Sequence, residues 1–258
     1  MLIDSHCHLH DRQFFTEEQA EKMVKNAMKN KVKKIVCIGT DPDDSLAARD
    51  FALNHENIFW TYGVHPEETN TDRKPLKLAS ADKIKKIFSK NRPIAIGEVG
   101  LDYHSEEHDR DAQIKLFNEM LQLARDYDLP VSFHIRNAFD DFFEVVKNYP
   151  EVHGVVHSFT DSKKTLKRIL NETNFYVGVN GLATYSTLPT PPLERILLET
   201  DAPFLTPTPF RGIINEPAYI YNIAEWLSKK LEVDFEKVEK ETTKNAEQLF
   251  CFSDSRDR

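Results

Sequence analysis

The chain has 258 residues, close to the roughly 250 of a barrel of eight β/α units, and nothing in its composition suggests two domains. Hydrophobic residues make up 40% and charged residues 29%, values that exclude a largely disordered chain. A formal net charge of −8 argues against a broad basic surface for nucleic acid, so any contact with DNA is expected to be local, such as a strand end held in a pocket.

The N-terminal residues lack the basic start and the apolar run that a signal peptide needs. No apolar stretch of the sequence approaches the roughly 20 residues of a membrane span. The three cysteines, at positions 7, 37 and 251, are too widely spaced to predict a disulfide framework or a Cys-rich zinc site. We therefore expect a cytosolic protein that does not associate with a membrane.

Short apolar runs alternate with longer helical patterns along the chain. The predicted strands are residues 2–6, 34–39, 58–63, 93–98, 130–134, 154–157, 175–179 and 195–200. The predicted helices are residues 17–31, 43–54, 81–89, 109–128, 138–148, 161–170, 216–231 and 235–250, with Thr16 and Asp161 as start signals. This alternation predicts a single (β/α)₈ TIM barrel over residues 1–252, followed by a disordered tail at 253–258. An open doubly wound sheet fits the alternation as well, but no Gly-x-Gly-x-x-Gly follows a strand.

Polar side chains stand at or just beyond the last apolar residue of six predicted strands. The active sites of β/α barrels lie at this end of their strands, so these side chains are expected to cluster there. Strand alternation also places His6 and His8 on one side of the first strand and Cys7 on the other. The candidates at the strand ends are His6, His8, His65, Glu98, His134, His157 and Asp201.

Each of these residues alone has an ordinary structural explanation. A histidine at a strand end is often part of the core, Glu98 could be solvated beside a glycine turn, and Asp201 could cap a helix or turn. Taken together, they form a mixed nitrogen and oxygen ligand set for two divalent ions, such as Mg, Mn, Zn or Ni. Two such ions activate a water for attack on a phosphodiester, so no nucleophilic Ser or Cys is required. The predicted metal ligands are His6, His8, Glu98, His134, His157 and Asp201.

The chain resembles the TatD family of metal-dependent hydrolases through an ordered set of strings over nearly its whole length. The strings are DSHCHLH from Asp4, GVHPE from Gly63, GEVGLDYH from Gly97, HIR from His134, HSF from His157, LLETDAPFL from Leu197, RGIINEPAYI from Arg211 and TTKNAEQLF from Thr242. The resemblance implies an amidohydrolase-like barrel and a deoxyribonuclease, often a 3′→5′ exonuclease. We expect single-stranded DNA as the substrate and a monomeric enzyme.

The resemblance also implies a role for each candidate residue. One metal would be held by His6, His8, Glu98 and Asp201, and the other by Glu98, His134 and His157. Asp201 would orient or deprotonate the attacking water, and His65 would contact the substrate phosphate or act as an acid. Glu98, Asp201 and His65 are therefore the expected catalytic residues.

Further residues are candidates for binding the substrate. Arg136 and Arg211 could each hold a phosphate through two hydrogen bonds, although a surface salt bridge is an equally common role. Asn215 either fixes the loop after Arg211 or caps the helix predicted to start at residue 216. Aromatic side chains that could stack on bases, at about 1–3 kcal/mol each, are Tyr103, Phe159, Tyr185 and Phe210.

Two features of the sequence depart from the family. Asn137 stands where relatives usually carry an acidic residue, and residues 181–192 are short and Pro-rich where relatives have a fuller helix. Two alternative functions also stay open. One is an amidohydrolase or phosphotriesterase-like hydrolase of a small molecule, although many of these bridge their metals with a modified lysine that residues 93–98 lack. The other is a catalytically silent scaffold, which predicts damaged metal ligands.

Overall fold

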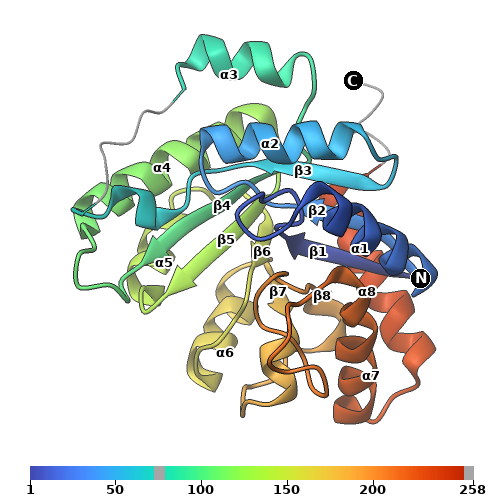
Figure 1. Ribbon diagram of the computed structural model, residues 1–258. Coiled ribbons are helices and arrows are strands. Elements are labelled where there is room, and N and C mark those ends of the chain that lie inside the picture. Colours follow the sequence, from blue (N-terminus) through green and yellow to red (C-terminus); the bar gives the residue numbers. More distant parts are fainter. Residues whose placement is uncertain (73–78, 253–258) are drawn as a thin grey trace.

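The structure is a computed structural model and describes residues 1–72 and 79–252 (Figure 1). Its sheet has eight strands in the order β1 to β8, and every adjacent pair is parallel. The strands are β1 (Leu2–Cys7), β2 (Val32–Cys37), β3 (Ile58–Tyr62), β4 (Ala95–Asp102), β5 (Val131–Arg136), β6 (Gly154–Val156), β7 (Tyr176–Val179) and β8 (Ile196–Leu198). The predicted TIM barrel is confirmed, whereas the predicted disordered tail lies outside the described residues.

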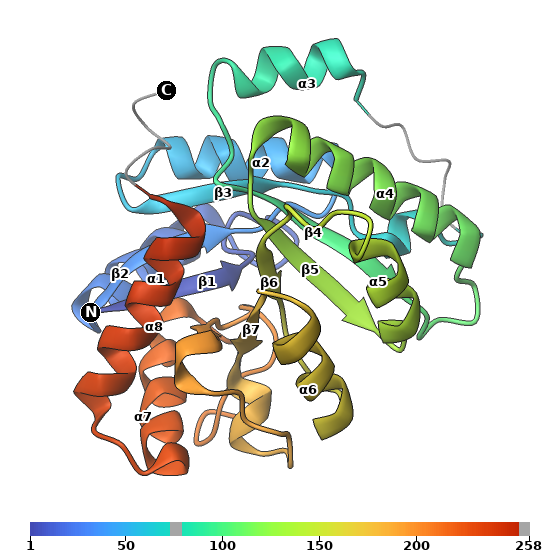
Figure 2. The same ribbon diagram turned by 180° about the vertical axis from the view of Figure 1, so that it is seen from behind.

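The helices surround the sheet, as the two opposite views show (Figures 1 and 2). They are α1 (Glu17–Lys29), α2 (Pro42–Leu53), α3 (Ala81–Phe88), α4 (Arg110–Tyr127), α5 (Phe139–Val146), α6 (Lys163–Glu172), α7 (Ile220–Leu231) and α8 (Phe235–Phe250). Thr16 caps α1 as predicted, because its side chain accepts from the backbone N–H of Gln19. The start signal predicted at Asp161 is one residue early, since Ser162 is the residue that caps α6. None of the described helices is long and apolar enough to cross a membrane.

The connection from β7 to β8 contains no α-helix, and the structure describes all of it. Two short 3₁₀ turns, Gly181–Thr184 and Leu193–Arg195, stand in its place. The Pro-rich sequence of this segment explains the difference, because proline lacks the N–H that a helix interior requires. Both α7 and α8 therefore follow β8, and the wall of the barrel mouth beside β7 is a loop.

The barrel closes between β1 and the residues that follow β8. The backbone N–H of Asp201 donates to the carbonyl of His6 at 2.9 Å, and that of His8 donates to Ala202 at 2.8 Å. Below this point the buried carboxylate of Asp4 accepts from the backbone N–H of Thr200 at 2.9 Å, and burial raises the Asp4 pKa to about 8. The closure brings Asp201 beside His6 and His8.

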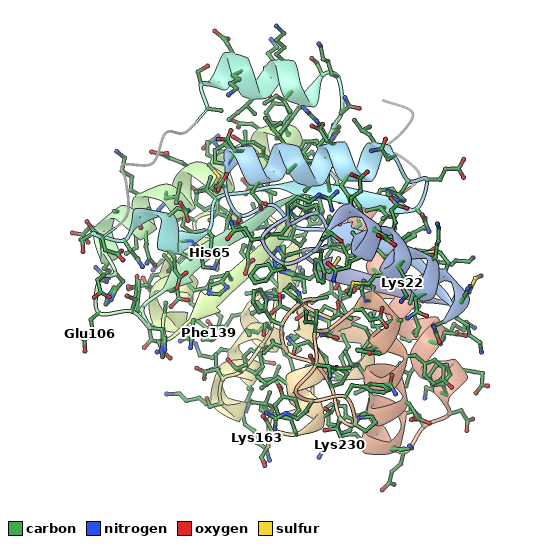
Figure 3. All side chains as sticks on the ribbon, viewed as in Figure 1. Lys22, His65, Glu106, Phe139, Lys163 and Lys230 are labelled. Carbon is green, nitrogen blue, oxygen red and sulfur yellow. The ribbon has the colours of Figure 1, made fainter. Side chains whose placement is uncertain are left out.

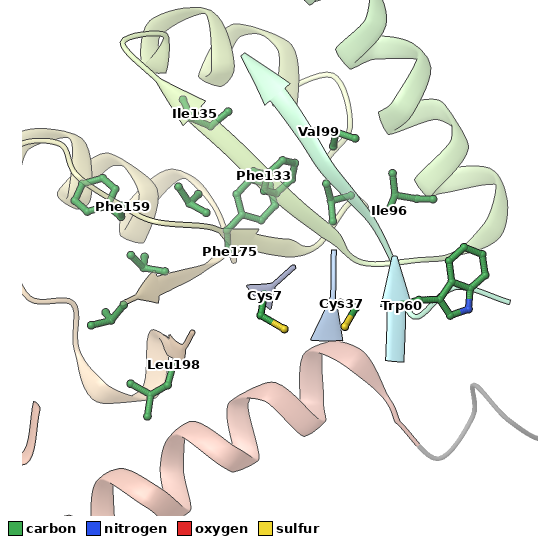
Figure 4. Close-up of a cluster of buried hydrophobic side chains, with 14 of the residues drawn as sticks. Cys7, Cys37, Trp60, Ile96, Val99, Phe133, Ile135, Phe159, Phe175 and Leu198 are labelled. Atoms are coloured by element: carbon green, nitrogen blue, oxygen red, sulfur yellow. The ribbon is translucent and has the colours of Figure 1, made fainter. Parts of the chain in front are cut away.

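The core lies between the strands and the helices. Cys7 and Cys37 are paired residues of β1 and β2, and both are buried in the main hydrophobic cluster with Phe133 and Phe175 (Figure 4). The Cys7 side chain thus packs in the core while its neighbours His6 and His8 approach each other, as strand alternation predicted. A second cluster packs the end of α8 against apolar residues from six strands.

Candidate metal centre

A cavity of about 720 Å³ opens at the C-terminal ends of the strands. His65, labelled in Figure 3, belongs to its lining. The lining also includes other residues predicted for the site, namely His8, Glu98, His134, Arg136, His157 and Asp201. His6 lies just beneath, fully buried. The six predicted metal ligands therefore converge at one end of the barrel.

Glu98 is buried at the centre of this group. Its Oε1 lies 2.7 Å from Nδ1 of His134 and 3.8 Å from Nε2 of His157, and its Oε2 lies 3.5 Å from Nε2 of His6. Oε1 is also 3.9 Å from Nε2 of His65. The two carboxylate oxygens thus face different histidines, which is the arrangement that a bridging ligand needs.

Asp201 completes the cluster from the opposite side. Its Oδ1 lies 3.5 Å from Nε2 of His8, 3.7 Å from Nε2 of His6 and 4.0 Å from Nε2 of His157. The backbone of Asp201 has φ +57°, a left-handed conformation that aspartate tolerates better than most residues. Hydrogen bonds from Asp201 to the carbonyl of His6, and from Phe204 to the carbonyl of Asp201, hold this conformation.

The histidines that face this centre have a second polar contact on the outer side of the ring. Nδ1 of His8 lies 3.1 Å from the carbonyl oxygen of Ile38, so that nitrogen carries the proton and Nε2 presents its lone pair inward. Nε2 of His134 lies 2.8 Å from Asp102, and Nδ1 of His157 lies 3.1 Å from Glu199. These contacts orient metal-ligating histidines in proteins, so the set of donors fits a pair of divalent cations.

The potential ligand atoms fall into three groups, within each of which they lie no more than 4.8 Å apart. The groups are His6, Glu98 and His157; His6, His8 and Asp201; and His65, Glu98 and His134. Glu98 and His6 are each shared between groups. His65, expected to contact the substrate, is here also close enough to act as a ligand.

The carboxylates and imidazoles of the cluster shift one another's pKa values. Burial opposes the ionisation of Glu98, but His6 and His134 outweigh it and hold the Glu98 pKa well below its usual range. Burial also opposes charge on His134, yet Asp102 and Glu98 raise its pKa to about 9. Glu199 does the same for His157, whose pKa rises to about 10. The carboxylates of the cluster thus favour the protonated forms of both histidines.

His65 behaves differently from the other histidines. Burial and the neighbouring His134 lower its pKa to about 3, so its ring is neutral. Its Nδ1 accepts from the backbone N–H of Glu67 at 3.2 Å, so the proton lies on Nε2. His65 can therefore donate a hydrogen bond into the cavity.

Two carboxylates of the site, Asp102 and Glu199, were not predicted. The predicted fourth strand ended at Glu98, but β4 continues to Asp102 because residues 99–101 remain buried between neighbouring elements. On a strand, residues two and four apart share a side, which puts Asp102 on the side of Glu98. Glu199 lies two residues before Asp201, so the same alternation puts both on one side of the chain. Alternation counted onward from Glu98 and back from Asp201 could have identified both carboxylates.

The residues predicted to bind substrate do not all line the cavity. Arg136 is exposed and lines the cavity. Arg211 does not belong to the lining; its guanidinium lies over the ring of Tyr185, 3.9 Å from the centroid. Tyr103 also lies outside the lining, because its hydroxyl is held by Asp141 at 2.7 Å.

The remaining substrate candidates also have structural contacts. Phe159 is buried in the core, so the prediction that it stacks on a base is wrong. Phe210 stacks on Tyr219 at 4.4 Å. Asn215 donates to the carbonyls of Thr200 at 2.8 Å and Phe204 at 2.6 Å, so it fixes the loop after β8 and does not cap a helix.

The family departure at Asn137 lies outside the centre. Its side chain is exposed, and its backbone has φ +56°, a conformation in which asparagine is enriched. Asn137 lines a separate cavity with Asp140 and Arg168. No contact joins Asn137 to the metal-ligand candidates among the described residues.

Comparison with known proteins extends these observations. A family model described as TatD related DNase matches residues 3–251. The uncharacterized metal-dependent hydrolase YabD of Bacillus subtilis is 34% identical over 97% of this chain and 99% of its own length. A putative deoxyribonuclease TATDN1 homolog of Enterocytozoon bieneusi is 31% identical over 83% of this chain and 84% of its own. The crystal structure of the TatD homolog YJJV from Escherichia coli has a TM-score of 0.83 at 26% identity, covering 97% and 98% of the two chains. With these matches and its centre of histidines and carboxylates, the chain belongs to the TatD-related DNase family and is a metal-dependent hydrolase.

Proposed function

We propose that the chain hydrolyses phosphodiester bonds of DNA at a strand end, as a 3′→5′ exonuclease on single-stranded DNA. The observation that carries the proposal is the position of Glu98, whose two oxygens face separate histidines across the barrel mouth. The family description and the putative deoxyribonuclease among the relatives support DNA as the substrate.

In this proposal the two divalent cations share Glu98, and each has further ligands of its own. His6, His8, Glu98 and Asp201 would hold one cation, and Glu98, His134 and His157 would hold the other. When bound, the cations supply Lewis acidity for the phosphoryl oxygen and the leaving oxygen. The mixed nitrogen and oxygen ligands accept Mg, Mn, Zn or Ni, so the supply of each metal in the cell also decides which one binds.

Asp201 and His65 have complementary roles toward the substrate. Burial opposes the charge of Asp201, but His8, His157 and His6 hold its pKa below the usual range, so it is a carboxylate at neutral pH. It lines the cavity and can accept a proton from the attacking water. The neutral His65 ring donates from Nε2 to a phosphate oxygen, a role that its low pKa favours over that of an acid.

The charges around the cavity favour a small contact with the DNA. Arg136 is the one lysine or arginine among the described lining residues, whereas Asp11, Glu67 and Glu68 also line the cavity. Lys22, Lys163 and Lys230, labelled in Figure 3, lie on the outer helices α1, α6 and α7. An acidic rim repels a continuous phosphate backbone, so the cavity suits one strand end better than the middle of a duplex.

A single-stranded oligonucleotide labelled at its 5′ end tests the proposal. With Mg or Mn, the wild type is expected to give a ladder that shortens from the 3′ end, and a chelator should abolish it. Asp201→Asn should lower the rate by at least about 100-fold, since it removes the proton acceptor. Asp140→Asn, which changes an exposed carboxylate on α5, is the matched control and should cut like the wild type. Intact DNA with every metal would contradict the proposal.

A further inference from the structure

The rim of the cavity carries a pair of exposed aromatic side chains. Phe14 is 43% exposed and Phe204 is 45% exposed, and both belong to the cavity lining. Their ring centroids are 5.1 Å apart with the planes at 81°, so one ring stands edge-on to the other. Exposed phenylalanines are costly in water, and two in contact at the mouth of an enzyme cavity are typical of a ligand-binding surface.

Backbone hydrogen bonds fix this pair beside the metal centre. The N–H of Phe204 donates to the carbonyl of Asp201 at 2.8 Å, and Asn215 donates to the carbonyl of Phe204 at 2.6 Å. The ring of Phe204 lies 6.4 Å from the ring of His8. Phe14 follows β1, and its N–H donates to Asp11 at 3.3 Å. The two rings therefore come from the segments that close the barrel, next to the candidate ligands His8 and Asp201.

We propose that Phe14 and Phe204 form a stacking platform for the base of a nucleotide at the scissile phosphodiester. This inference rests on the proposed function. An edge-to-face pair leaves an aromatic face open to a flat ring, and every base has such a face. Because the Phe204 ring lies 6.4 Å from the ring of His8, a base stacked on it would be close to a phosphate at the candidate metal centre.

The platform adds affinity for the substrate that the charged side chains of the cavity do not provide. Arg136 is the one lysine or arginine in the described part of the lining, so few side chains there can hold phosphates away from the metal centre, and stacking is a further source of affinity. A base can reach the platform only after it has left its own stack. The platform therefore selects unpaired ends, and a terminal nucleotide without a base should be a poor substrate.

The test compares oligonucleotides that end in normal nucleotides with oligonucleotides carrying an abasic residue at the last or next-to-last position. For the wild type, the abasic residue at one of these positions should lower kcat/KM by about 5- to 100-fold. Phe204→Ala should lower kcat/KM for the normal oligonucleotide by a similar factor and should abolish the difference between the two substrates. Phe14→Ala, on a separate segment, should act in the same direction.

Two variants separate stacking from other effects. Phe204→Trp should keep the preference for a base, whereas Phe204→Leu, which keeps apolar area without a π face, should lose it. Leu53→Ala, which truncates an exposed side chain far from the cavity, should behave as the wild type. If Phe204→Ala discriminates against the abasic substrate as strongly as the wild type does, the platform is overturned while the proposed nuclease stands. If the wild type cuts neither substrate, the proposed function and the platform fall together.

Discussion

At the scale of single residues, Asp102 determines how His134 is presented to the centre. Its Oδ2 contacts Nε2 of His134 at 2.8 Å, which leaves Nδ1 of the same ring facing Glu98. The backbone N–H of His104 also donates to Asp102 at 2.8 Å, so the carboxylate is itself held in place. The contact therefore fixes both the tautomer and the orientation of a predicted ligand.

Asp102→Asn should weaken metal binding by about 10-fold, because loss of such an outer contact typically costs 10- to 100-fold in affinity. The measurement is calorimetric titration of chelator-treated protein with Mn, with circular dichroism to show that the fold is kept. Asp140→Asn provides the control on the exposed surface. An unchanged dissociation constant for Asp102→Asn would remove Asp102 from the centre.

The sequence predicted the candidate metal ligands better than the residues that surround them. His6, His8 and Asp201 were predicted from their positions at strand ends, and the two histidines also from strand alternation, which can be read from a few neighbouring residues. Asp102 depends on how far β4 continues, and strand ends are set by packing between elements. Glu199 lies inside the predicted strand at 195–200, but its contact with His157 depends on how two distant strands are placed. Phe14 and Phe204 lie in two different loops, and the helix and strand periodicities do not predict which loop residues come into contact.

At the scale of elements, the loop after β8 depends on one buried side chain. Asn215 is fully buried, and its amide donates to two carbonyls, those of Thr200 and Phe204. These bonds tie the loop to the residues on either side of Asp201. Because the β7 to β8 connection lacks a helix, this loop forms a large part of the mouth near the aromatic pair.

Asn215→Ala should lower the free energy of unfolding by about 2–4 kcal/mol, since two buried carbonyls lose their donor. Urea denaturation of the metal-free protein measures this change. Asn148→Ala is a suitable control, because its amide makes one bond, to Glu144, on the exposed surface of α5. Equal stability of Asn215→Ala and the wild type would show that water replaces the lost bonds without cost.

At the scale of the whole molecule, the net charge of −8 governs how the substrate is approached. A contact limited to one or two phosphates of a single strand predicts a slope of about −1 when log kcat/KM is plotted against log salt concentration. A groove that held eight phosphates would give a slope of about −6. Initial rates on a 20-nucleotide strand between about 50 and 200 mM salt, with the metal concentration fixed, distinguish the two. A steep slope would contradict a strand-end contact.

The order of the strands also has a consequence for synthesis. The candidate centre draws His6 and His8 from the start of the chain and Asp201 from beyond β8, and backbone bonds of Asp201 to His6 and of His8 to Ala202 bring them together. A nascent chain that has emerged only as far as β7 contains His6 and His8 but lacks Asp201, the carboxylate of their group. Metal binding by His6, His8 and Asp201 together would therefore require that the two ends of the barrel have met, so that barrel closure precedes assembly of this group.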